Sequence, residues 1–405
     1  MLRRSGFAGA LVAVVAVTAL GGCAFVARVS QPSGNPPPAE SNGASAHPSI
    51  SKTGRYVAFD STATNLVAND TNGLTDVFVH DFVTRTTVRV SVGVGGVQAT
   101  GASRNPSISA DGQRIAFESD AANLVAADAD TTTDVFVHDL AAGTTILASV
   151  ATDGSPFVRA TKRPVLSGNG QSVVFSLDLE AQGFCCVPVP TVRRTDLATT
   201  TVLTSAVFGT VMAITDDGTR LALVATAPGP GDGGTYAIRI VDAAGVIVRE
   251  IASGTISHQS QGYALLTLSG DGSTVAWFLG NRASGQVKVE ALGPPVVAPA
   301  FTTTVSGMEF LKLSTTGQSL FVRNASTVDG QPVGSLWEAG STVLRVVSTN
   351  KNGAISNLYG GQDLSGDGKW VALEVFGAGM IDDDTNGVAD IFLRSTGASK
   401  VGPTA

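Results

Sequence analysis

The chain has 405 residues, of which 43% are hydrophobic and only 15% are charged. This composition supplies enough apolar material for a large core and excludes a chain that is disordered over most of its length. The formal net charge is −7 and no basic run occurs, so we expect no binding to nucleic acid.

The N-terminal segment has the organisation of a secretory signal. Arg3 and Arg4 precede an apolar run over residues 7–20, which is too short for a comfortable membrane span. The run closes with Leu20-Gly-Gly-Cys23, and small residues directly before a cysteine resemble the lipobox of bacterial lipoproteins. This resemblance implies a lipoprotein signal peptide over residues 1–22 and a lipid-modified Cys23 as the mature N-terminus. Acyl chains would anchor the protein in the cell membrane, facing the extracytoplasmic side; a soluble secreted protein cleaved elsewhere is the alternative.

Residues 23–47 allow two interpretations. Their prolines, together with Ser, Gly and Asn, favour a lipidated N-terminus followed by a flexible tether. However, Ala27-Arg-Val-Ser30 parallels Val88-Arg-Val-Ser91, which is the last predicted strand of a later repeat unit. If this parallel holds, residues 25–30 supply the outer strand of the final unit and close a ring.

From residue 48 onward the chain repeats one pattern seven times. Each copy has a short apolar strand, a tight turn closed by glycine and a second apolar strand. The turn glycines are Gly54, Gly112, Gly170, Gly218, Gly272, Gly317 and Gly368. A third strand, such as Asp76-Val-Phe-Val-His-Asp81, and usually a fourth, such as Thr86-Thr-Val-Arg-Val-Ser91, follow each hairpin.

Four such strands, rich in Val, Ile, Phe and Thr, form one antiparallel sheet. A small sheet cannot bury both of its faces alone, whereas seven sheets stacked around an axis can, and ring closure protects their edges. We therefore predict an all-β fold, a seven-bladed β-propeller of four-stranded antiparallel blades, over residues 48–405.

The best-matched repeats carry a family resemblance. Ser-x-Asp-Gly-x-x-[Ile/Val]-Ala-Phe followed by Asp-Val-Phe-Val-x-Asp resembles the TolB-like, WD-repeat-like β-propellers of bacterial envelope proteins, and it covers residues 48–395. The proline that often precedes the Asp-Gly turn in that family is absent, and Lys52, Ala110 and Gly270 stand in its neighbourhood. The resemblance implies the propeller fold and does not imply one function, because this fold hosts many roles.

Acidic loops join the predicted second and third strands in the first, second and seventh repeats. Their candidate ligands are Asp70, Asn72 and Asp76; Asp128, Asp130 and Asp134; and Asp382, Asp384, Asn386 and Asp390. The last loop fits Asp-x-Asp-x-Asn-Gly-x-x-Asp, a spacing that resembles the short calcium loops of dockerin-like and thrombospondin-like repeats. Alternating oxygen ligands and a glycine at the sharp turn suit a hard cation, so Ca²⁺ is the expected cofactor. Alternatively, these side chains cap turns by accepting hydrogen bonds from local amides.

The pair Cys185-Cys186 falls in the corresponding loop of the third repeat. Outside the cytoplasm these thiols can oxidise. A vicinal disulfide, an intermolecular bridge or reactive thiol, and inert thiols all stay open. Because the loops after the second strands share the face opposite the Gly hairpins, the acidic loops of consecutive units would be neighbours there.

Motifs typical of catalysis were not found: the sequence has no Gly-x-Ser-x-Gly, His-Glu-x-x-His or phosphate-binding loop. His80 and His138 occupy the same strand position in two repeats, which favours shared packing. The leading hypothesis is a lipid-anchored, non-catalytic scaffold that binds a protein or glycan partner through the acidic-loop face. The alternatives are an envelope glycan-active hydrolase or lyase with its site at the central mouth, and a purely structural spacer.

Overall fold

The computed structural model describes most of the chain after its N-terminal segment. The described residues are 25–34, 39–128, 130–151, 153–157, 160–177, 189–194, 199–202, 210–228, 233–257, 263–280, 284–293, 301–305, 308–328, 331–350, 352–356, 358–377, 380–382, 384–397 and 403. The predicted signal peptide with Cys23, and the pair Cys185 and Cys186, lie outside them. Among the described residues, no helix is long and apolar enough to cross a membrane.

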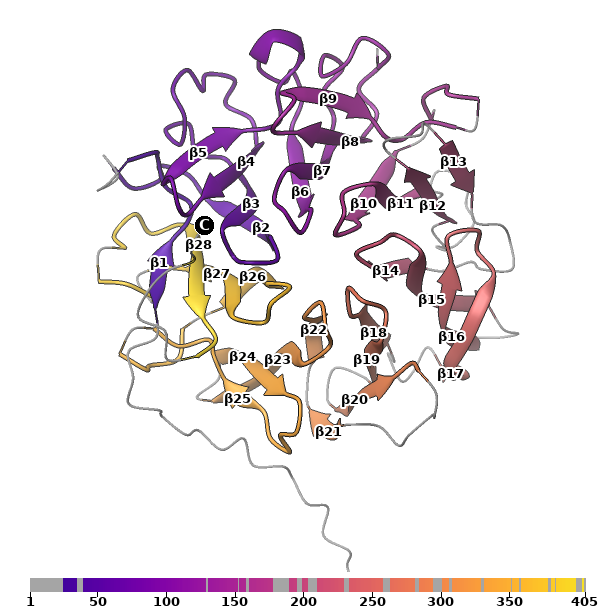
Figure 1. The fold of residues 1–405 in the computed structure, drawn as a ribbon. Helices are drawn as coiled ribbons and strands as arrows, with labels where there is room; N and C mark the ends of the chain where they lie inside the picture. The colour runs from indigo at the N-terminus through magenta and orange to yellow at the C-terminus, as the bar shows by residue number, and fades with distance from the viewer. Residues whose placement is uncertain are drawn as a thin grey trace, which may run out of the picture.

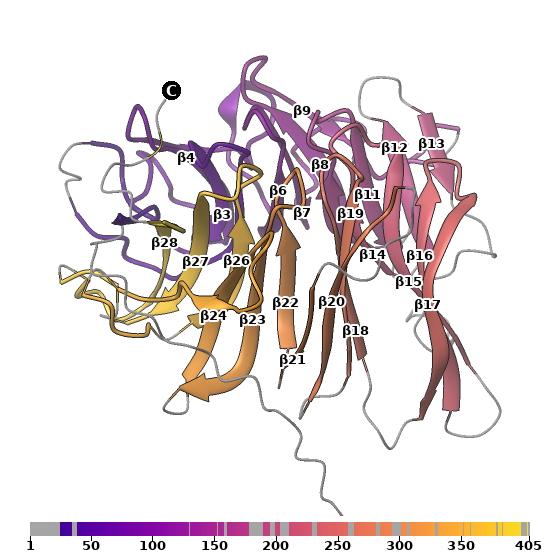
Figure 2. The ribbon, with the colours of Figure 1, turned by 60° about the horizontal axis from the view of Figure 1, so that its bottom comes forward.

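The described strands form seven four-stranded antiparallel sheets that stand around a common axis (Figure 1). The inner strands of the blades run roughly along this axis, whereas the outer strands are tilted across it (Figure 1 and Figure 2). Neighbouring sheets contact each other, and the last sheet contacts the first. This is the all-β propeller that the repeats predict, with one four-stranded blade for each repeat.

The strand bounds follow the repeats. Blade 1 has β2 (Ser45–Ile50), β3 (Tyr56–Ser61), β4 (Asp76–Asp81) and β5 (Thr86–Arg89); blade 2 has β6 (Ser103–Ile108), β7 (Arg114–Ser119), β8 (Asp134–Asp139) and β9 (Thr144–Leu147). Blade 3 has β10 (Thr161–Leu166), β11 (Ser172–Leu177), β12 (Val189–Arg194) and β13 (Thr199–Val202); blade 4 has β14 (Thr210–Ile214), β15 (Arg220–Pro228), β16 (Gly233–Asp242) and β17 (Ile247–Ser257). Blade 5 has β18 (Tyr263–Leu268), β19 (Thr274–Gly280), β20 (Gly285–Ala291) and β21 (Phe301–Val305); blade 6 has β22 (Met308–Leu313), β23 (Ser319–Val328), β24 (Gln331–Glu338) and β25 (Arg345–Val346). Blade 7 has β26 (Leu358–Leu364), β27 (Trp370–Phe376), β28 (Ala389–Ser395) and, from the N-terminal segment, β1 (Val26–Arg28); a short 3-10 helix, η1 (Val94–Gly96), follows β5.

The N-terminal strand completes the last blade. β1 pairs antiparallel with β28, so that Arg28 lies opposite Phe392 (Figure 1). Val29, directly after β1, is fully buried in the apolar cluster that blades 7 and 1 share. Of the two interpretations of residues 23–47, the structure therefore has the closing strand. The first blade also begins at Ser45, a little before the predicted boundary at residue 48.

Backbone hydrogen bonds between the Gly hairpins join the blades a second time, at the end of the axis where the hairpins lie. Lys52 N donates to Ala110 O at 2.9 Å, and Ala110 N donates to Gly168 O at 2.8 Å. The same relation continues through the hairpins of blades 4 to 7, and the last bond runs from Asp367 N to Lys52 O at 2.9 Å. Because each bond satisfies a backbone group that no sheet uses, the hairpins are tied into a closed ring.

The second strand of a blade has a continuous apolar run because both faces of the sheet are covered there. In β3, Val57 and Phe59 pack in the cluster shared with blade 7, whereas Ala58 packs in the cluster shared with blade 2. Adjacent residues of a strand point to opposite faces, so a strand between two neighbours reads as a continuous apolar run. The hairpins pack as closely: at Gly112 φ is +76°, and a Cβ there would overlap the ring of Tyr56 in blade 1.

His80 and His138 occupy equivalent positions in β4 and β8, as the repeats predict. Nδ1 of His80 lies 3.0 Å from Thr87 Oγ1, and Nδ1 of His138 lies 2.9 Å from Thr145 Oγ1. The Thr87 hydroxyl donates its own hydrogen to the Gln31 carbonyl at 2.6 Å, so Nδ1 of His80 is the donor to the threonine oxygen. Burial lowers the pKa of His80 to about 4, against a small opposing effect of the Asp81 charge, and burial lowers the pKa of His138 as well. Both histidines are therefore neutral packing residues.

Acidification should weaken the fold through these histidines. An unfolded histidine has a pKa of about 6.5, whereas His80 in the folded chain has a pKa of about 4. The unfolded state therefore takes up the proton first, and the stability that neutral His80 provides is lost as the pH falls from about 6.5 to about 4. We expect the urea midpoint to fall between about pH 7 and about pH 5, and to fall less in His80→Asn, which keeps a donor for Thr87 but does not titrate. Equal pH dependence in both proteins would contradict this assignment.

Candidate functional site

The predicted acidic loops lie at the ends of the blades opposite the Gly hairpins, because they join the second strand of a blade to the third. The Glu40 carboxylate accepts hydrogen bonds from Thr385 in the blade 7 loop, at 3.2 Å from N and 2.9 Å from Oγ1. The Glu40 carbonyl accepts one from Asn65 Nδ2 in the blade 1 loop at 2.7 Å. Between blades 1 and 2, Gln98 accepts from Asn123 Nδ2 at 2.8 Å and from the backbone of the blade 1 loop. The loops of residues 377–388, 62–75 and 120–133 therefore share one face, the acidic-loop face.

In blade 1, the guanidinium group of Arg89 lies between two buried carboxylates. Its Nη1 is 3.0 Å from Asp70 Oδ1 and 3.3 Å from Asp76 Oδ2. Asp76 Oδ2 also accepts a hydrogen bond from Asn72 Nδ2 at 2.9 Å, and Asp76 Oδ1 accepts one from Ser91 Oγ at 2.6 Å. Both oxygens of Asp76 are thus bonded, and one positive charge stands beside two negative ones.

Blade 7 repeats this arrangement with a residue from β1. Arg28 Nη2 lies 3.1 Å from Asp384 Oδ1, and Arg28 Nε lies 3.7 Å from Asp390 Oδ2. Asn386 Nδ2 donates to Asp390 Oδ2 at 2.8 Å, and Ser30 Oγ donates to Asp390 Oδ1 at 2.6 Å. Arg28 and Ser30 therefore contact the loop aspartates of blade 7 as Arg89 and Ser91 contact those of blade 1.

These two arginines change what can be expected of their loops. A metal ion bound by Asp70 and Asp76, or by Asp384 and Asp390, would need the place that a guanidinium group holds. Asp382, the remaining predicted ligand of the third loop, is exposed. Calcium binding in the loops of blades 1 and 7 stays a prediction, and the positive charge already present there argues against it.

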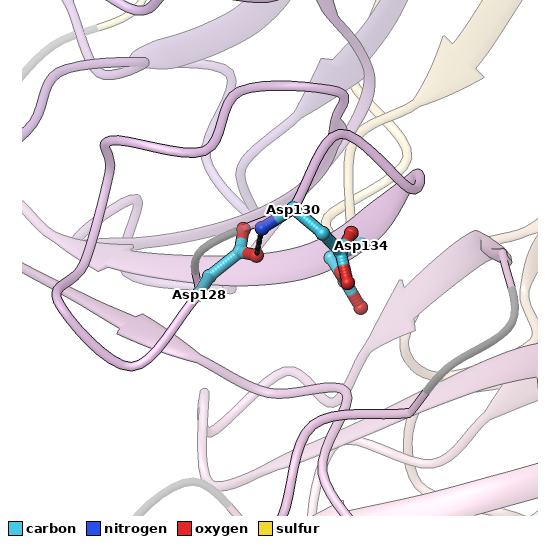
Figure 3. Close-up of side chains that lie close together, drawn as sticks. All are labelled: Asp128, Asp130 and Asp134. Atoms are coloured by element: carbon cyan, nitrogen blue, oxygen red, sulfur yellow. Dashed lines mark hydrogen bonds between the residues drawn. The ribbon is translucent and has the colours of Figure 1, made fainter.

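The loop of blade 2 brings its three aspartates close together (Figure 3). One carboxylate oxygen from each of Asp128, Asp130 and Asp134 lies within 4.8 Å of the others. Asp134 Oδ1 accepts a hydrogen bond from Ser149 Oγ at 2.5 Å, but among the described residues Asp134 Oδ2 has no hydrogen-bond partner, and neither does Asp128 Oδ2. Asp128 and Asp134 are buried, whereas Asp130 is exposed. The three predicted ligands of this loop are therefore brought together around two uncovered oxygens.

The pKa values of the buried aspartates in these loops depend on their burial and on the charges beside them. Burial raises the pKa of Asp134 to about 7, the charges of Asp128 and Asp130 add to this increase, and the hydrogen bond from Ser149 opposes it. Burial raises the pKa of Asp384 to about 6, although Arg28 lowers it. Burial disfavours the ionised carboxylates in both places, and more so at Asp134, beside which no arginine lies among the described residues.

A small cavity lies on the axis at the hairpin end. It has a volume of about 110 Å³ and is lined by residues of all seven blades, among them Lys52, Asp216, Lys312 and Asp363. Lys312 Nζ is 3.5 Å from Asp363 Oδ1, while Asp363 Oδ2 accepts a hydrogen bond from Ile50 N at 3.0 Å. Asp363 thus links blade 7 to blade 1, as hydroxyl groups link other pairs of blades.

The arginines are the residues that the analysis of the sequence did not assign to the loops. The available signal was Arg-Val-Ser at residues 28–30 and again at residues 89–91, with Leu147-Ala-Ser149 in its place in the second repeat. Cys23 and the pair Cys185-Cys186 lie outside the described residues, so the lipid modification stays a prediction and the alternatives for the cysteine pair stay open.

No protein-family model matches the chain, and no curated protein sequence is significantly similar to it. Solved structures are similar in fold. The β-propeller domain of the Trilobed protease from Pyrococcus furiosus aligns with a TM-score of 0.53 and 10% identity, over 87% of this chain and 95% of that one. Oligogalacturonate lyase from Vibrio parahaemolyticus aligns with a TM-score of 0.51 and 10% identity, over 93% of this chain and 92% of that one.

TolB from Acinetobacter baumannii is also among the similar structures, with a TM-score of 0.41 and 11% identity, over 80% of this chain and 76% of that one. At 10% identity, the likenesses to the Pyrococcus domain and the Vibrio lyase show the propeller fold alone. The Pyrococcus domain has an open velcro topology by its description, whereas here β1 pairs with β28 and joins the two ends of the chain in one blade.

Proposed function

We propose that the chain is a lipid-anchored β-propeller of the extracytoplasmic side of the cell membrane, and that it acts as a non-catalytic binding module. The partner is a protein or a glycan, and the acidic-loop face receives it. The lipobox-like Leu20-Gly-Gly-Cys23 supports the membrane address. A ring of blades whose hairpins are hydrogen-bonded to one another all the way round supports a rigid scaffold role.

Exposed aromatic side chains are the reason for choosing the acidic-loop face as the binding surface. Tyr359 and Phe376 lie at the end of blade 7 that bears the acidic loop, with 64% and 49% of their surfaces exposed. Their ring centroids are 5.7 Å apart. Exposed aromatic pairs of this kind are enriched in the cores of protein interfaces and also provide flat apolar surface for a sugar ring.

The axial cavity supports binding over catalysis. A glycan-active hydrolase or lyase would need a mouth that admits a sugar unit, and ligand sites of that kind have volumes of about 300–1,000 Å³. The cavity at the hairpin end has about 110 Å³. Asp363, the carboxylate that pairs with Lys312 there, is already committed to the contact between blades 7 and 1.

The proposal is tested by comparing the two faces. A tagged full chain would be used to capture partners from envelope extract, with Tyr359→Ser/Phe376→Ser as the variant. The matched control is Val246→Ser/Val248→Ser, which removes two exposed apolar residues at the hairpin end of blade 4. We expect the aromatic variant to lose the captured partner and the control to keep it. Capture that survives in the aromatic variant, or that fails in the control alone, would refute the choice of face.

A further inference from the structure

Blade 2 lacks, at one position, a positive charge that blades 1 and 7 have. Arg89 lies opposite Phe78 in the pairing of β5 with β4, and Arg28 lies opposite Phe392 in the pairing of β1 with β28. In blade 2 the residue opposite Phe136 is Leu147. Leu147 is buried in the apolar cluster between blades 1 and 2. An uncharged side chain therefore stands where the equivalent blades place a guanidinium group.

The same blade has one carboxylate more than blade 1 at the equivalent positions. Asn72 and Asn386 each donate Nδ2 to Oδ2 of the aspartate four residues later. At this position blade 2 has Asp130, which when ionised has no hydrogen to donate. Asp134 has thus lost both donors, the amide and the guanidinium, that cover Oδ2 of Asp76 in blade 1.

The three carboxylates are nevertheless held in place by their other oxygens. Asp128 Oδ1 accepts a hydrogen bond from Asp130 N at 3.3 Å, and Asp130 Oδ1 accepts one from Thr132 N at 2.7 Å. Ser149 holds Asp134 Oδ1 in the same way. Local hydrogen bonds therefore account for one oxygen of each carboxylate, and within the part of the chain that the structure describes the buried Oδ2 atoms of Asp128 and Asp134 have no partner. Turn capping, the alternative to metal binding, explains only half of the arrangement.

We propose that a calcium ion binds between Asp128, Asp130 and Asp134 and replaces, in blade 2, the guanidinium groups that serve blades 1 and 7. Buried carboxylates require a compensating positive charge, and a divalent ion can bond several uncovered oxygens at once. Calcium suits a site made only of oxygens and completes its coordination with water, for which the exposed side at Asp130 leaves room. The inference does not depend on the proposed binding function.

The direct experiment is calorimetric titration of the metal-free full chain with calcium. We expect one ion per chain, with a dissociation constant of about 10⁻⁵ to 10⁻³ M, which extends from the weakest sensor sites to the extracellular modules. Magnesium should bind more weakly, because it loses its water reluctantly. Calcium should also raise the denaturation temperature, and a chelator should reverse this. If the titration shows no binding, or if magnesium binds and calcium does not, the proposal is wrong.

Three variants locate the site. Asp130→Asn should weaken calcium binding at least about tenfold, because affinity follows the number of charged ligands. Asp130→Asn/Leu147→Arg recreates the residue set of blade 1 and should fold without calcium, bind none and unfold at the same temperature with and without chelator. Asp153→Asn is the control and should bind calcium as the unmodified chain does. Asp153 is an exposed aspartate in the connection from blade 2 to blade 3, where it accepts a hydrogen bond from the Ser155 hydroxyl.

The double variant keeps the test decisive if Asp130→Asn alone proves unstable, since its arginine supplies the missing charge. Calcium that binds the double variant with unchanged affinity would place the ion elsewhere and overturn the assignment. Loss of binding in Asp153→Asn would overturn it equally.

Discussion

A chain shortened to begin at Ala44 should be far less stable than one that begins at Cys23. The shorter chain lacks β1, so β28 loses its partner strand and Asp384 and Asp390 lose Arg28. Leaving a buried carboxylate without its partner costs about 3–5 kcal/mol. Loss of the buried Val29 side chain adds about 1.5–3 kcal/mol, which together is a large part of the usual stability of about 5–15 kcal/mol.

Urea unfolding followed by tryptophan fluorescence would measure the difference, and the chain that begins at Cys23 is the matched control because it keeps β1. We expect a lower midpoint and a broader transition for the shorter chain. A synthetic peptide of residues 23–43, added in excess, should restore part of the lost stability, since it contains β1 and Ser41, whose hydroxyl donates to Asp390 at 3.1 Å. Identical midpoints for the two chains would show that the N-terminal strand does not close the ring in solution.

Arg89→Leu should destabilise the propeller by about 3–5 kcal/mol, because it leaves the buried carboxylates of Asp70 and Asp76 without a positive charge. Urea unfolding again provides the measurement. Arg55→Leu is the control: Arg55 pairs with Asp81 at 2.9 Å where both side chains are partly exposed, and such pairs contribute at most about 1 kcal/mol.

A second substitution separates charge from packing. Asp70→Asn in the Arg89→Leu background should recover much of the stability, because it removes one of the two uncompensated charges. Asn72→Asp in that background instead recreates the carboxylate set of blade 2, and the resulting protein should become more stable when calcium is added. If Arg89→Leu costs no more than Arg55→Leu, the guanidinium group does not compensate the carboxylates as we infer.

The propeller could be predicted because each repeat carries its own local sequence signals and these signals recur seven times. Each Gly hairpin has its own signal, as at Gly112, where positive φ and the neighbouring Tyr56 exclude a side chain. The continuous apolar run Val57-Ala-Phe59 indicates a strand covered on both faces. Seven copies of such a unit, none able to bury its own faces, require mutual stacking whatever their loops contain. The packing role of His80 and His138 could be predicted for the same reason, because histidines at equivalent positions of two repeats indicate a shared environment.

The ring closure and the loops depended on contacts between residues far apart in the chain. That residues 26–28 form a strand is decided by β28, more than three hundred residues later, because a three-residue segment has no strand preference strong enough to act alone. The sequence by itself determined that blades 7, 1 and 2 carry similar acidic loops between their second and third strands. Only the tertiary structure decided which of these loops have an arginine beside their buried carboxylates. The balancing positive charge comes from a different strand, through Arg28 in β1 or Arg89 in β5, whereas the equivalent Leu147 in blade 2 is uncharged.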